Sequence, residues 1–293
     1  MQLNSVDSKM ASLRKLLKQS IKSSFGSLLD VFGKTRLGAH AYETMLNSAM
    51  GKTKTIIHND VKLSFCTPNG LNRFRVDSFS TKEPETLEWI DTMQSGSVLW
   101  DIGANIGLYS CYAAKKNRVS VYAFEPSVFN LELLARNIFM NHLVDKVIIV
   151  PLPLSDMVKI STLNMTTMEW GGALSSFGEN YGDDGKEMKK AFEFSSIGLS
   201  MDKAVSHLNI PPPTHIKIDV DGIEHLILSG GHSVLSQVKE VAIEVNEDFS
   251  LQTVNVEKHM KEAGLIFKEK RHSAMFDNNI RFGNTFNQVW HRI

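Results

Sequence analysis

Side chains that can move a proton gather in the stretch 215–224, which reads His-Ile-Lys-Ile-Asp-Val-Asp-Gly-Ile-Glu. Its alternating isoleucine and valine residues predict a buried strand, and in an open parallel sheet ligands bind where such strands end. The charged residues at that end are Lys217, Asp219, Asp221 and Glu224. A carboxylate placed there can accept a proton from a hydroxyl group, so we expect Asp219 or Glu224 to act as a general base. Lys217 would hold the reacting molecule or tune the pKa of a carboxylate.

A second candidate site is the stretch 97–110, Ser-Val-Leu-Trp-Asp-Ile-Gly-Ala-Asn-Ile-Gly-Leu-Tyr-Ser. Residues 98–102 form a short apolar run that is typical of a buried parallel strand. Two glycines then bracket a tight turn before a predicted helix at 107–114, and this geometry brings backbone N–H groups close to a polar ligand. The residues that we expect to bind the ligand here are Asp101, Gly103, Ala104, Asn105 and Gly107.

The ligand that suits this turn carries positive charge. The dinucleotide-binding fingerprint G-x-G-x-x-G, counted from Gly103, would need two more glycines where the sequence has Asn105 and Leu108. The carboxylate of Asp101 would repel a pyrophosphate, but it would attract the amine and sulfonium of S-adenosylmethionine. We therefore expect S-adenosylmethionine as the cofactor. A nicotinamide-dependent oxidoreductase and a non-catalytic nucleotide-binding module are the alternatives.

Two further strand ends carry polar residues. The run 119–124 leads into a glutamate, and a carboxylate at the end of the second strand can accept hydrogen bonds from both ribose hydroxyls. The apolar run 147–152 leads into a serine and an aspartate that we expect to meet an adenine, although both residue types also favour simple turns. The predicted nucleoside contacts are Glu125, Pro126, Ser127, Ser155 and Asp156.

Taken together, these stretches resemble the FkbM family of methyltransferases over roughly residues 75–246. The motifs that carry the resemblance are Val98–Gly107, Phe124-Glu125-Pro126, Leu154-Ser155-Asp156 and Ile216–Glu224, with Glu83-Pro84-Glu85-Thr86 resembling a subgroup. The two motifs D-x-G-A-N-x-G and K-I-D-x-[ED]-G-x-E together are more specific for this family than either motif alone. One departure is Asp221, where the family usually carries glutamate, and this shortens the reach of the carboxylate by one methylene.

The resemblance implies an α/β, Rossmann-like class I methyltransferase fold. Its sheet would have seven strands, mostly parallel with one antiparallel strand, and helices on both faces. The resemblance also implies S-adenosylmethionine as methyl donor and an oxygen acceptor that is often a sugar hydroxyl. We therefore predict O-methylation of a hydroxyl on a saccharide or small metabolite.

The sequence predicts a helical N-terminal extension, residues 1–50, and a methyltransferase domain, residues 51–293. Apolar residues recur at helical spacing from Leu13 to Leu28, which indicates an amphipathic helix. Such a helix packs on its own domain, on a second copy of the chain in a homo-oligomer, or on a membrane surface. The stretch 157–213 is long for a link between strands, so we expect an inserted lid that binds the acceptor.

Local patterns predict the remaining elements. Strands are expected at 54–57, 61–65, 160–165, 192–199, 240–245, 265–270 and 286–292, helices at 84–93, 129–141, 226–235 and 254–263, and an extended segment at 75–79. The first two strands should form a hairpin, the next two should pair within the insert, and the last two should close the sheet.

The composition of the chain argues against several classes of binding partner. Lys+Arg and Asp+Glu are 32 each, so no net field attracts nucleic acid. Two distant cysteines, Cys66 and Cys111, do not form a disulfide framework or a zinc site and favour a cytoplasmic location. No apolar run is long enough for an integral membrane segment. We expect no metal, although a set of oxygen ligands from Asp219, Asp221 and Glu224 is an alternative.

Overall fold

The computed structural model describes residues 26–273, 275, 277 and 281–293. The chain divides into two compact units, with the division after Lys52. In the first unit, residues 26–33 are helical and helix α2 spans Arg36–Met50, capped by the side chain of Thr35. The amphipathic helix expected from Leu13 to Leu28 falls mostly outside the described residues. None of the described helices is both long and apolar enough to cross a membrane.

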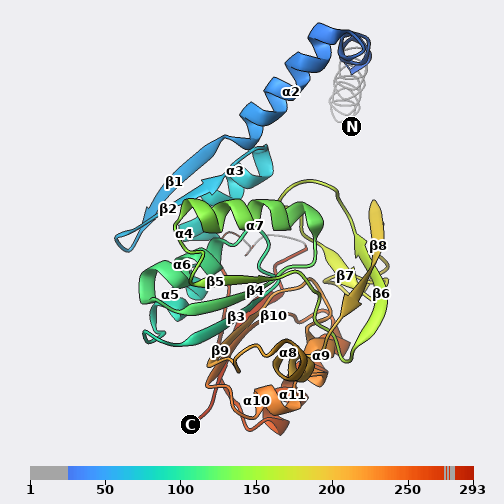
Figure 1. Cartoon of the computed structure of the whole chain (residues 1–293). Helices are drawn as coiled ribbons and strands as arrows, with labels where there is room; N and C mark the ends of the chain where they lie inside the picture. Colours follow the sequence, from blue (N-terminus) through green and yellow to red (C-terminus); the bar gives the residue numbers. More distant parts are fainter. Residues whose placement is uncertain (1–25, 274, 276, 278–280) are drawn as a thin grey trace, which may run out of the picture. The chain divides into compact units, whose positions relative to one another are not determined.

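The second unit is built on a seven-stranded sheet with the order β11-β12-β10-β9-β3-β4-β5 (Figure 1). These strands are β3 Val98–Ile102, β4 Ser120–Phe124, β5 Val147–Val150, β9 His215–Ile218, β10 Glu240–Asn246, β11 Ile266–Arg271 and β12 Thr285–His291. Strand β12 runs antiparallel to both of its neighbours, and the other adjacent pairs are parallel. The expected sheet, with one antiparallel strand, is confirmed.

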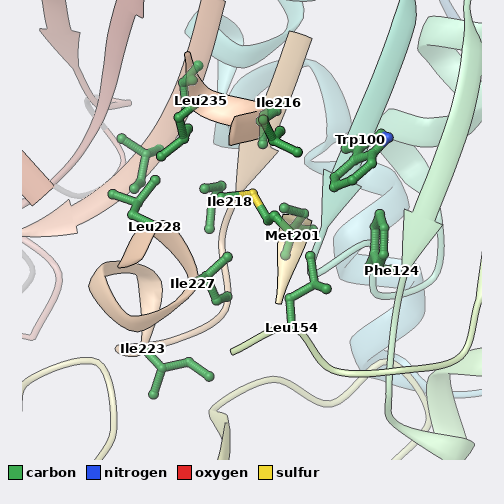
Figure 2. Close-up of a cluster of buried hydrophobic side chains, with 14 of the residues drawn as sticks. Trp100, Phe124, Leu154, Met201, Ile216, Ile218, Ile223, Ile227, Leu228 and Leu235 are labelled. Carbon is green, nitrogen blue, oxygen red and sulfur yellow. The ribbon is translucent and has the colours of Figure 1, made fainter. Parts of the chain in front are cut away.

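Helices cover both faces of this sheet, which explains why the central strands are apolar on both sides. One face carries α5 Pro84–Asp91, α6 Leu108–Asn117 and α7 Val128–Met140, and the other carries α8 Met201–Leu208, α9 Glu224–Ser229, α10 His232–Leu235 and α11 Ser250–Glu262. On the second face, Trp100 and Phe124 lie with ring centroids 5.1 Å apart, and Ile218, Ile227 and Met201 pack in the same cluster (Figure 2). This core fixes the ends of β3, β4 and β9.

A hairpin of β1 Thr53–His58 and β2 Val61–Cys66 precedes the sheet, as expected. The prediction of an extended segment at 75–79 is wrong, because helices α3 Gly70–Asp77 and α4 Phe79–Lys82 occupy this region. The side chain of Asn69 accepts a hydrogen bond from the backbone N–H of Asn72 and starts α3.

The insert forms a small sheet of its own, with the strand order β7-β6-β8. Its strands are β6 Lys159–Met165, β7 Ser175–Phe177 and β8 Phe192–Gly198. Strands β6 and β8 pair antiparallel, which confirms the predicted pairing inside the insert. The loop between β6 and β7 continues toward the carboxyl ends of the main strands, and its residues 170–175 are called the strap below.

Candidate active site

Two adjoining cavities lie at the carboxyl ends of β3 and β9. The chain runs from β3 outward through β4 and β5 and later returns to β9 on the other side of β3, so this is the topological switch point of the sheet. The large cavity has a volume of about 370 Å³ and the small cavity about 60 Å³. The residues that line both are Gly103, Asn105, Ala173, Asp219 and Asp221.

The glycine turn after β3 packs directly against the end of β9. Gly103 has a φ of +86°, and a Cβ atom there would lie 1.9 Å from the carbonyl oxygen of Asp219. Gly107 has a φ of +81°, and a Cβ atom there would lie 2.4 Å from Leu134. Both positions therefore require glycine. Gly103 lines both cavities, whereas Gly107 lines neither and serves the packing of the turn against α7. Ala104 lines the large cavity beside Gly103.

Asp101, which was expected to attract a cationic ligand, is buried behind the turn and belongs to neither cavity wall. Its Oδ2 accepts a hydrogen bond of 2.5 Å from the Ser110 hydroxyl, while Oδ1 has no partner among the described residues. Burial raises the pKa of this carboxyl. A buried oxygen without a donor is unfavourable, and an ammonium group or a ligand-bound water would satisfy it.

Glu125 lies in the wall of the small cavity together with Pro126. Its two carboxyl oxygens accept hydrogen bonds of 2.7 Å, one from the backbone N–H of Asn105 and one from that of Ser127. Burial raises the pKa of Glu125 to about 7. The side chain of Asn130 also donates to this group. Because a carboxylate has about four lone-pair sites, it can still accept a ribose hydroxyl. Ser127 itself serves this hydrogen-bond pattern and does not line the cavity.

Ser155 and Asp156, the predicted adenine contacts, line neither cavity. The Ser155 hydroxyl donates to an Asp156 oxygen at 2.8 Å, and the same oxygen is 2.8 Å from the Lys159 ammonium. The residues just before them, 152–154, line the small cavity instead. That wall is apolar, as a flat heteroaromatic ring would require.

Asp219 is one of two carboxylates, with Asp221, that line both cavities. Its Oδ2 lies 2.8 Å from the ammonium of Lys217, and a quarter of its side chain is exposed. Burial alone would lower the pKa of Lys217, but the charges of Asp219 and Asp101 outweigh burial and raise it. Lys217 therefore stays protonated and cannot act as a base, whereas its charge holds the Asp219 carboxylate in place.

Asp221 faces the insert. Its backbone is left-handed, with a φ of +64°, and its Oδ2 accepts hydrogen bonds from the backbone N–H groups of Leu174, at 2.6 Å, and Ser175, at 3.4 Å. Burial, followed by the neighbouring charge of Asp219, raises the pKa of Asp221 to about 6. The shorter side chain at this position thus anchors the strap to the end of β9.

Glu224, the other expected base, is placed away from both cavities. Its oxygens accept hydrogen bonds from the backbone N–H groups of Val220 and Gly222 and, at 2.5 Å, from the amide of Gln252. The carboxylate therefore folds back onto the turn at the start of α9. Burial raises its pKa to about 7. This geometry assigns Glu224 to the support of the turn and leaves Asp219 as the base candidate.

A further group of polar side chains lines the large cavity, formed by Lys82, Glu83, Tyr109 and Glu244. Glu244 lies in the strand predicted at 240–245, where the sequence indicates an acceptor contact, whereas Lys82 and Tyr109 were not expected at the site. Glu83 is 3% exposed and lies 2.5 Å from the ammonium of Lys82. Burial alone would raise the pKa of Glu83, but Lys82 and Lys217 outweigh burial and lower it to about 2. Burial, with Asp219 and Glu83 nearby, raises the pKa of Glu244. The sequence signal for Glu83 was the Glu-Pro-Glu start of α5, which resembles a subgroup of the family but does not by itself indicate a place in the cavity.

The strap is held over the junction by hydrogen bonds from four different segments. The carbonyl oxygens of the strap accept from side chains: that of Trp170 from Asn69 and Asn72, that of Gly171 from Arg75, and that of Gly172 from Asn105 and Asn130. Two N–H groups of the strap donate to side-chain oxygens, that of Gly171 to Asn130 and that of Leu174 to Asp221. One short loop therefore connects α3, the glycine turn, α7 and the end of β9. Ala173 at its centre lines both cavities.

Within the described part of the chain, no group of three histidine, cysteine, aspartate or glutamate residues is arranged to hold a metal ion. The alternative ligand set of Asp219, Asp221 and Glu224 therefore does not form, because Glu224 points into the turn.

The sheet order, its single antiparallel strand and the glycine turn at the switch point define a Rossmann-like fold of the methyltransferase type. The family described as "Methyltransferase FkbM domain" matches residues 101–267, which is more than half of the chain. The chain therefore belongs to this family. This is a family of methyltransferases and not of nicotinamide-dependent oxidoreductases.

Individual relatives are distant. The chain is 26% identical over 163 residues to the hexuronic acid methyltransferase AglP of Haloferax volcanii, which covers 54% of this chain and 59% of that protein. Among solved structures, an FkbM methyltransferase from Methylobacillus flagellatus is 13% identical with a TM-score of 0.49, covering 75% of this chain and 52% of that chain. A tRNA m1G37 methyltransferase from M. jannaschii is 14% identical with a TM-score of 0.44, and the match covers 82% of this chain and 56% of that chain.

Proposed function

We propose that this protein transfers a methyl group from S-adenosylmethionine to a hydroxyl oxygen of a saccharide or small polyhydroxylated metabolite. The observation that carries the proposal is the position of Asp219. Its carboxylate lies where the small and large cavities meet, with Lys217 fixed 2.8 Å away. A base at the junction of two binding sites is where a proton must be removed as a group passes between them.

The residues present fit the cofactor. Glu125 and the apolar wall at 152–154 would hold the nucleoside, and the backbone of 103–105 would hold the amino-acid part. The unpartnered Oδ1 of Asp101 is buried behind the turn, where it would accept a hydrogen bond from a water bound to the cofactor's ammonium group. When bound, S-adenosylmethionine supplies an electrophilic methyl group on a sulfonium sulfur.

The chain's own contribution is alignment and proton removal. Asp219 accepts the proton of the acceptor hydroxyl while that oxygen bonds to the methyl carbon and the carbon–sulfur bond breaks, leaving its electron pair on sulfur. Lys217 remains protonated and keeps the carboxylate oriented. Holding two reactants in line contributes up to about 7–11 kcal/mol in favourable systems, so the fixed turn and the strap are central to the rate.

The large cavity supports a sugar-like acceptor. Its wall combines aromatic side chains, such as Phe79 and Tyr109, with hydrogen-bonding groups, such as Asn287 and Glu244. A pocket of this kind suits a ring that has apolar faces and hydroxyl edges. The curated relative is named for a hexuronic acid, which agrees with a sugar acceptor. The insert, through Ala173 and Leu174 in the cavity wall, would act as the acceptor-binding lid.

The test is transfer of an isotopically labelled methyl group to a panel of saccharides and hydroxylated metabolites. We expect Asp219→Asn to lower kcat by about 10²–10⁴-fold while the Kd for S-adenosylmethionine changes less than threefold, because only proton removal is lost. Asp145→Asn, at an exposed position outside both cavities, is the matched control and should keep full activity. Full turnover by Asp219→Asn would refute the assignment of the base. Cofactor binding with no transfer to any acceptor would instead indicate a non-catalytic nucleotide-binding module.

We further propose that residues 1–50 act as an extension separate from the methyltransferase domain and that they provide a homo-oligomer contact. We also propose a cytoplasmic location and no nucleic-acid partner. The two cysteines, Cys66 and Cys111, are buried and free, which agrees with a reducing compartment. Size measurement of the full chain and of a chain beginning at residue 51 would test the oligomer contact.

A further inference from the structure

The charged groups that line the large cavity are almost all satisfied by partners inside the protein. Each carboxylate with an assigned partner is held as follows: Asp219 by Lys217, Glu83 by Lys82, Asp221 by the N–H groups of Leu174 and Ser175, and Glu85 by the side-chain amide of Asn287. Both lysines of the wall are therefore already paired. An incoming molecule with a negative charge would have to share either lysine with a protein carboxylate at close range, which weakens the attraction.

Arg75 is the exception among the cations of this wall. It lies in the last turn of α3 and is partly exposed to the cavity. Its Nε donates to the carbonyl oxygen of Gly171 at 2.8 Å, and no carboxylate of the described residues lies within ion-pair distance of it. The bond to the strap uses one of the five guanidinium N–H groups. It fixes the plane of the group and leaves the two terminal nitrogens free to bind a ligand.

Such a group is suited to a carboxylate. A guanidinium presents parallel N–H donors that match the two oxygens of a carboxylate, and a charge-assisted bidentate contact is stronger than a neutral one. The fixed Nε contact removes part of the side-chain freedom that binding would otherwise have to restrict. Phe74, from the same helix, lines the cavity beside Arg75 and is 52% exposed, so an apolar ring face has a surface to pack on.

We propose that Arg75 is the specificity-determining residue for an acceptor that carries a carboxylate, so that the preferred substrate is an acidic sugar rather than a neutral one. This inference rests on the proposed function, because it names the acceptor class of the same cavity. It assigns the charge of the acceptor to one side chain outside the motifs that bind the cofactor. Asp219 removes the proton, and Arg75 selects the molecule.

The experiment compares matched pairs of methyl glycosides in the gluco, galacto and manno series, each as the neutral sugar and as its 6-carboxylate. Labelled-methyl transfer gives kcat/KM, and calorimetry on protein saturated with S-adenosylhomocysteine gives Kd without any reaction. For the wild-type protein we expect at least one acid to bind and react 10–100-fold better than its neutral partner, which is the range of a hydrogen bond to a charged group. The 6-sulfate analogue of that sugar is included, and weaker binding of it than of the carboxylate is expected.

The variants separate charge from support of the strap. Arg75→Gln should reduce the acid-to-neutral ratio to about one, Arg75→Lys should restore part of it, and Arg75→Glu should invert it in favour of the 6-amino sugar. Any loosening of the strap affects both members of a pair alike and leaves the ratio unchanged. Arg73→Gln, in the same helix and exposed outside the cavity, is the control and should keep the wild-type ratio.

The outcomes are distinct. A wild-type preference for neutral sugars, an absence of binding by any acid, or an unchanged ratio in Arg75→Gln would overturn the role of Arg75. If the acids bind through Arg75 but no methyl group is transferred, the role of Arg75 stands and the proposed methyl transfer to such acceptors fails. Transfer to neutral sugars alone would leave the proposed function intact and overturn the inference.

Discussion

The small and large cavities meet at Asp219 but are built in different ways. The small cavity is centred on the ends of neighbouring strands: Gly103 and Glu125 follow β3 and β4 directly, and Leu154 follows β5 by four residues. Residues of the insert and of α9 complete its wall. The large cavity is assembled from α3, α4 and α5, the strap and the C-terminal strands, segments that lie far apart in the chain.

This difference separates two functions of one cleft. The small cavity has walls made largely of backbone and apolar groups, so changes there disturb the fold and cofactor binding together. The large cavity holds two charge pairs, Lys82 with Glu83 and Lys217 with Asp219, on different segments of the chain. Under the proposed function, we expect single changes at the first pair to alter acceptor binding without disturbing the cofactor.

The change with the largest expected effect is Gly103→Ala. The new methyl group would lie 1.9 Å from the carbonyl oxygen of Asp219, at a φ of +86°, so the end of β9 must move. We expect the free energy of unfolding to fall by about 4 kcal/mol or more, with cofactor binding lost by calorimetry, because the turn and Asp219 shift together.

Gly96→Ala is the control for backbone strain alone. Gly96 has nearly the same φ, +85°, but nothing lies within 4 Å of the added Cβ. Its cost should be about 1–2 kcal/mol, with cofactor binding unchanged. If Gly103→Ala unfolds no more easily than Gly96→Ala and still binds the cofactor, the turn is not the rigid support that we describe.

Glu83→Gln tests the Lys82–Glu83 ion pair in the wall of the large cavity. The substitution removes a buried carboxylate that pairs with Lys82, whose side chain is about one third exposed, so we expect a loss of about 2 kcal/mol in stability at pH 7. The KM for the acceptor should rise about tenfold while the Kd for the cofactor stays within twofold. Glu88→Gln, on the exposed face of the same helix, should change neither.

The pH dependence gives the same test a second readout. The pKa of Glu83 is lowered from 4.5 to about 2, so its contribution to stability is complete above about pH 4.5 and is lost as the pH falls toward 2. The difference in unfolding free energy between wild type and Glu83→Gln should therefore shrink across that window. A constant difference from pH 7 to pH 3 would show that the lost stability is not electrostatic.

The same contrast explains which parts of the site could be predicted from sequence. Gly103 and Glu125 were found at the cleft because a residue that follows a buried parallel strand lies at the strand's end whatever the rest of the chain does. Glu224 was assigned to the cleft wrongly, because the direction of its side chain depends on how residues 220–223 turn before α9. Position along the chain does not determine that direction.

Arg75 and Glu83 were missed for another reason. Arg75 contacts the strap at Gly171, and the pKa of Glu83 depends on Lys217 as well as on its neighbour Lys82. Contacts between segments so far apart have no local signature in the sequence. The segment around Arg75 was even expected to be extended, since its apolar pattern is short and the cap at Asn69 was not recognised.

The smallest effect is expected at Glu125, and it belongs to the small cavity alone. Burial raises the pKa of Glu125 to about 7, so in the free protein the group is partly protonated at neutral pH. Ribose hydroxyls donate to the ionised form, so the bound cofactor should lower this pKa and binding should release a proton. The cofactor Kd should therefore decrease as the pH rises from 6.5 to 8, by about threefold for a shift of one pKa unit.

Calorimetry in buffers of different ionisation enthalpy measures both the Kd and the proton release. Glu125→Gln keeps the shape of the side chain but cannot titrate, so its Kd should be weaker and independent of pH over this range. The same pH slope in wild type and Glu125→Gln would place the titrating group elsewhere, with Asp221, whose pKa is raised to about 6, as the next group to test. Because Asp221 lines both cavities and Glu125 only the small one, that result would mean that protonation couples the two sites rather than belonging to one.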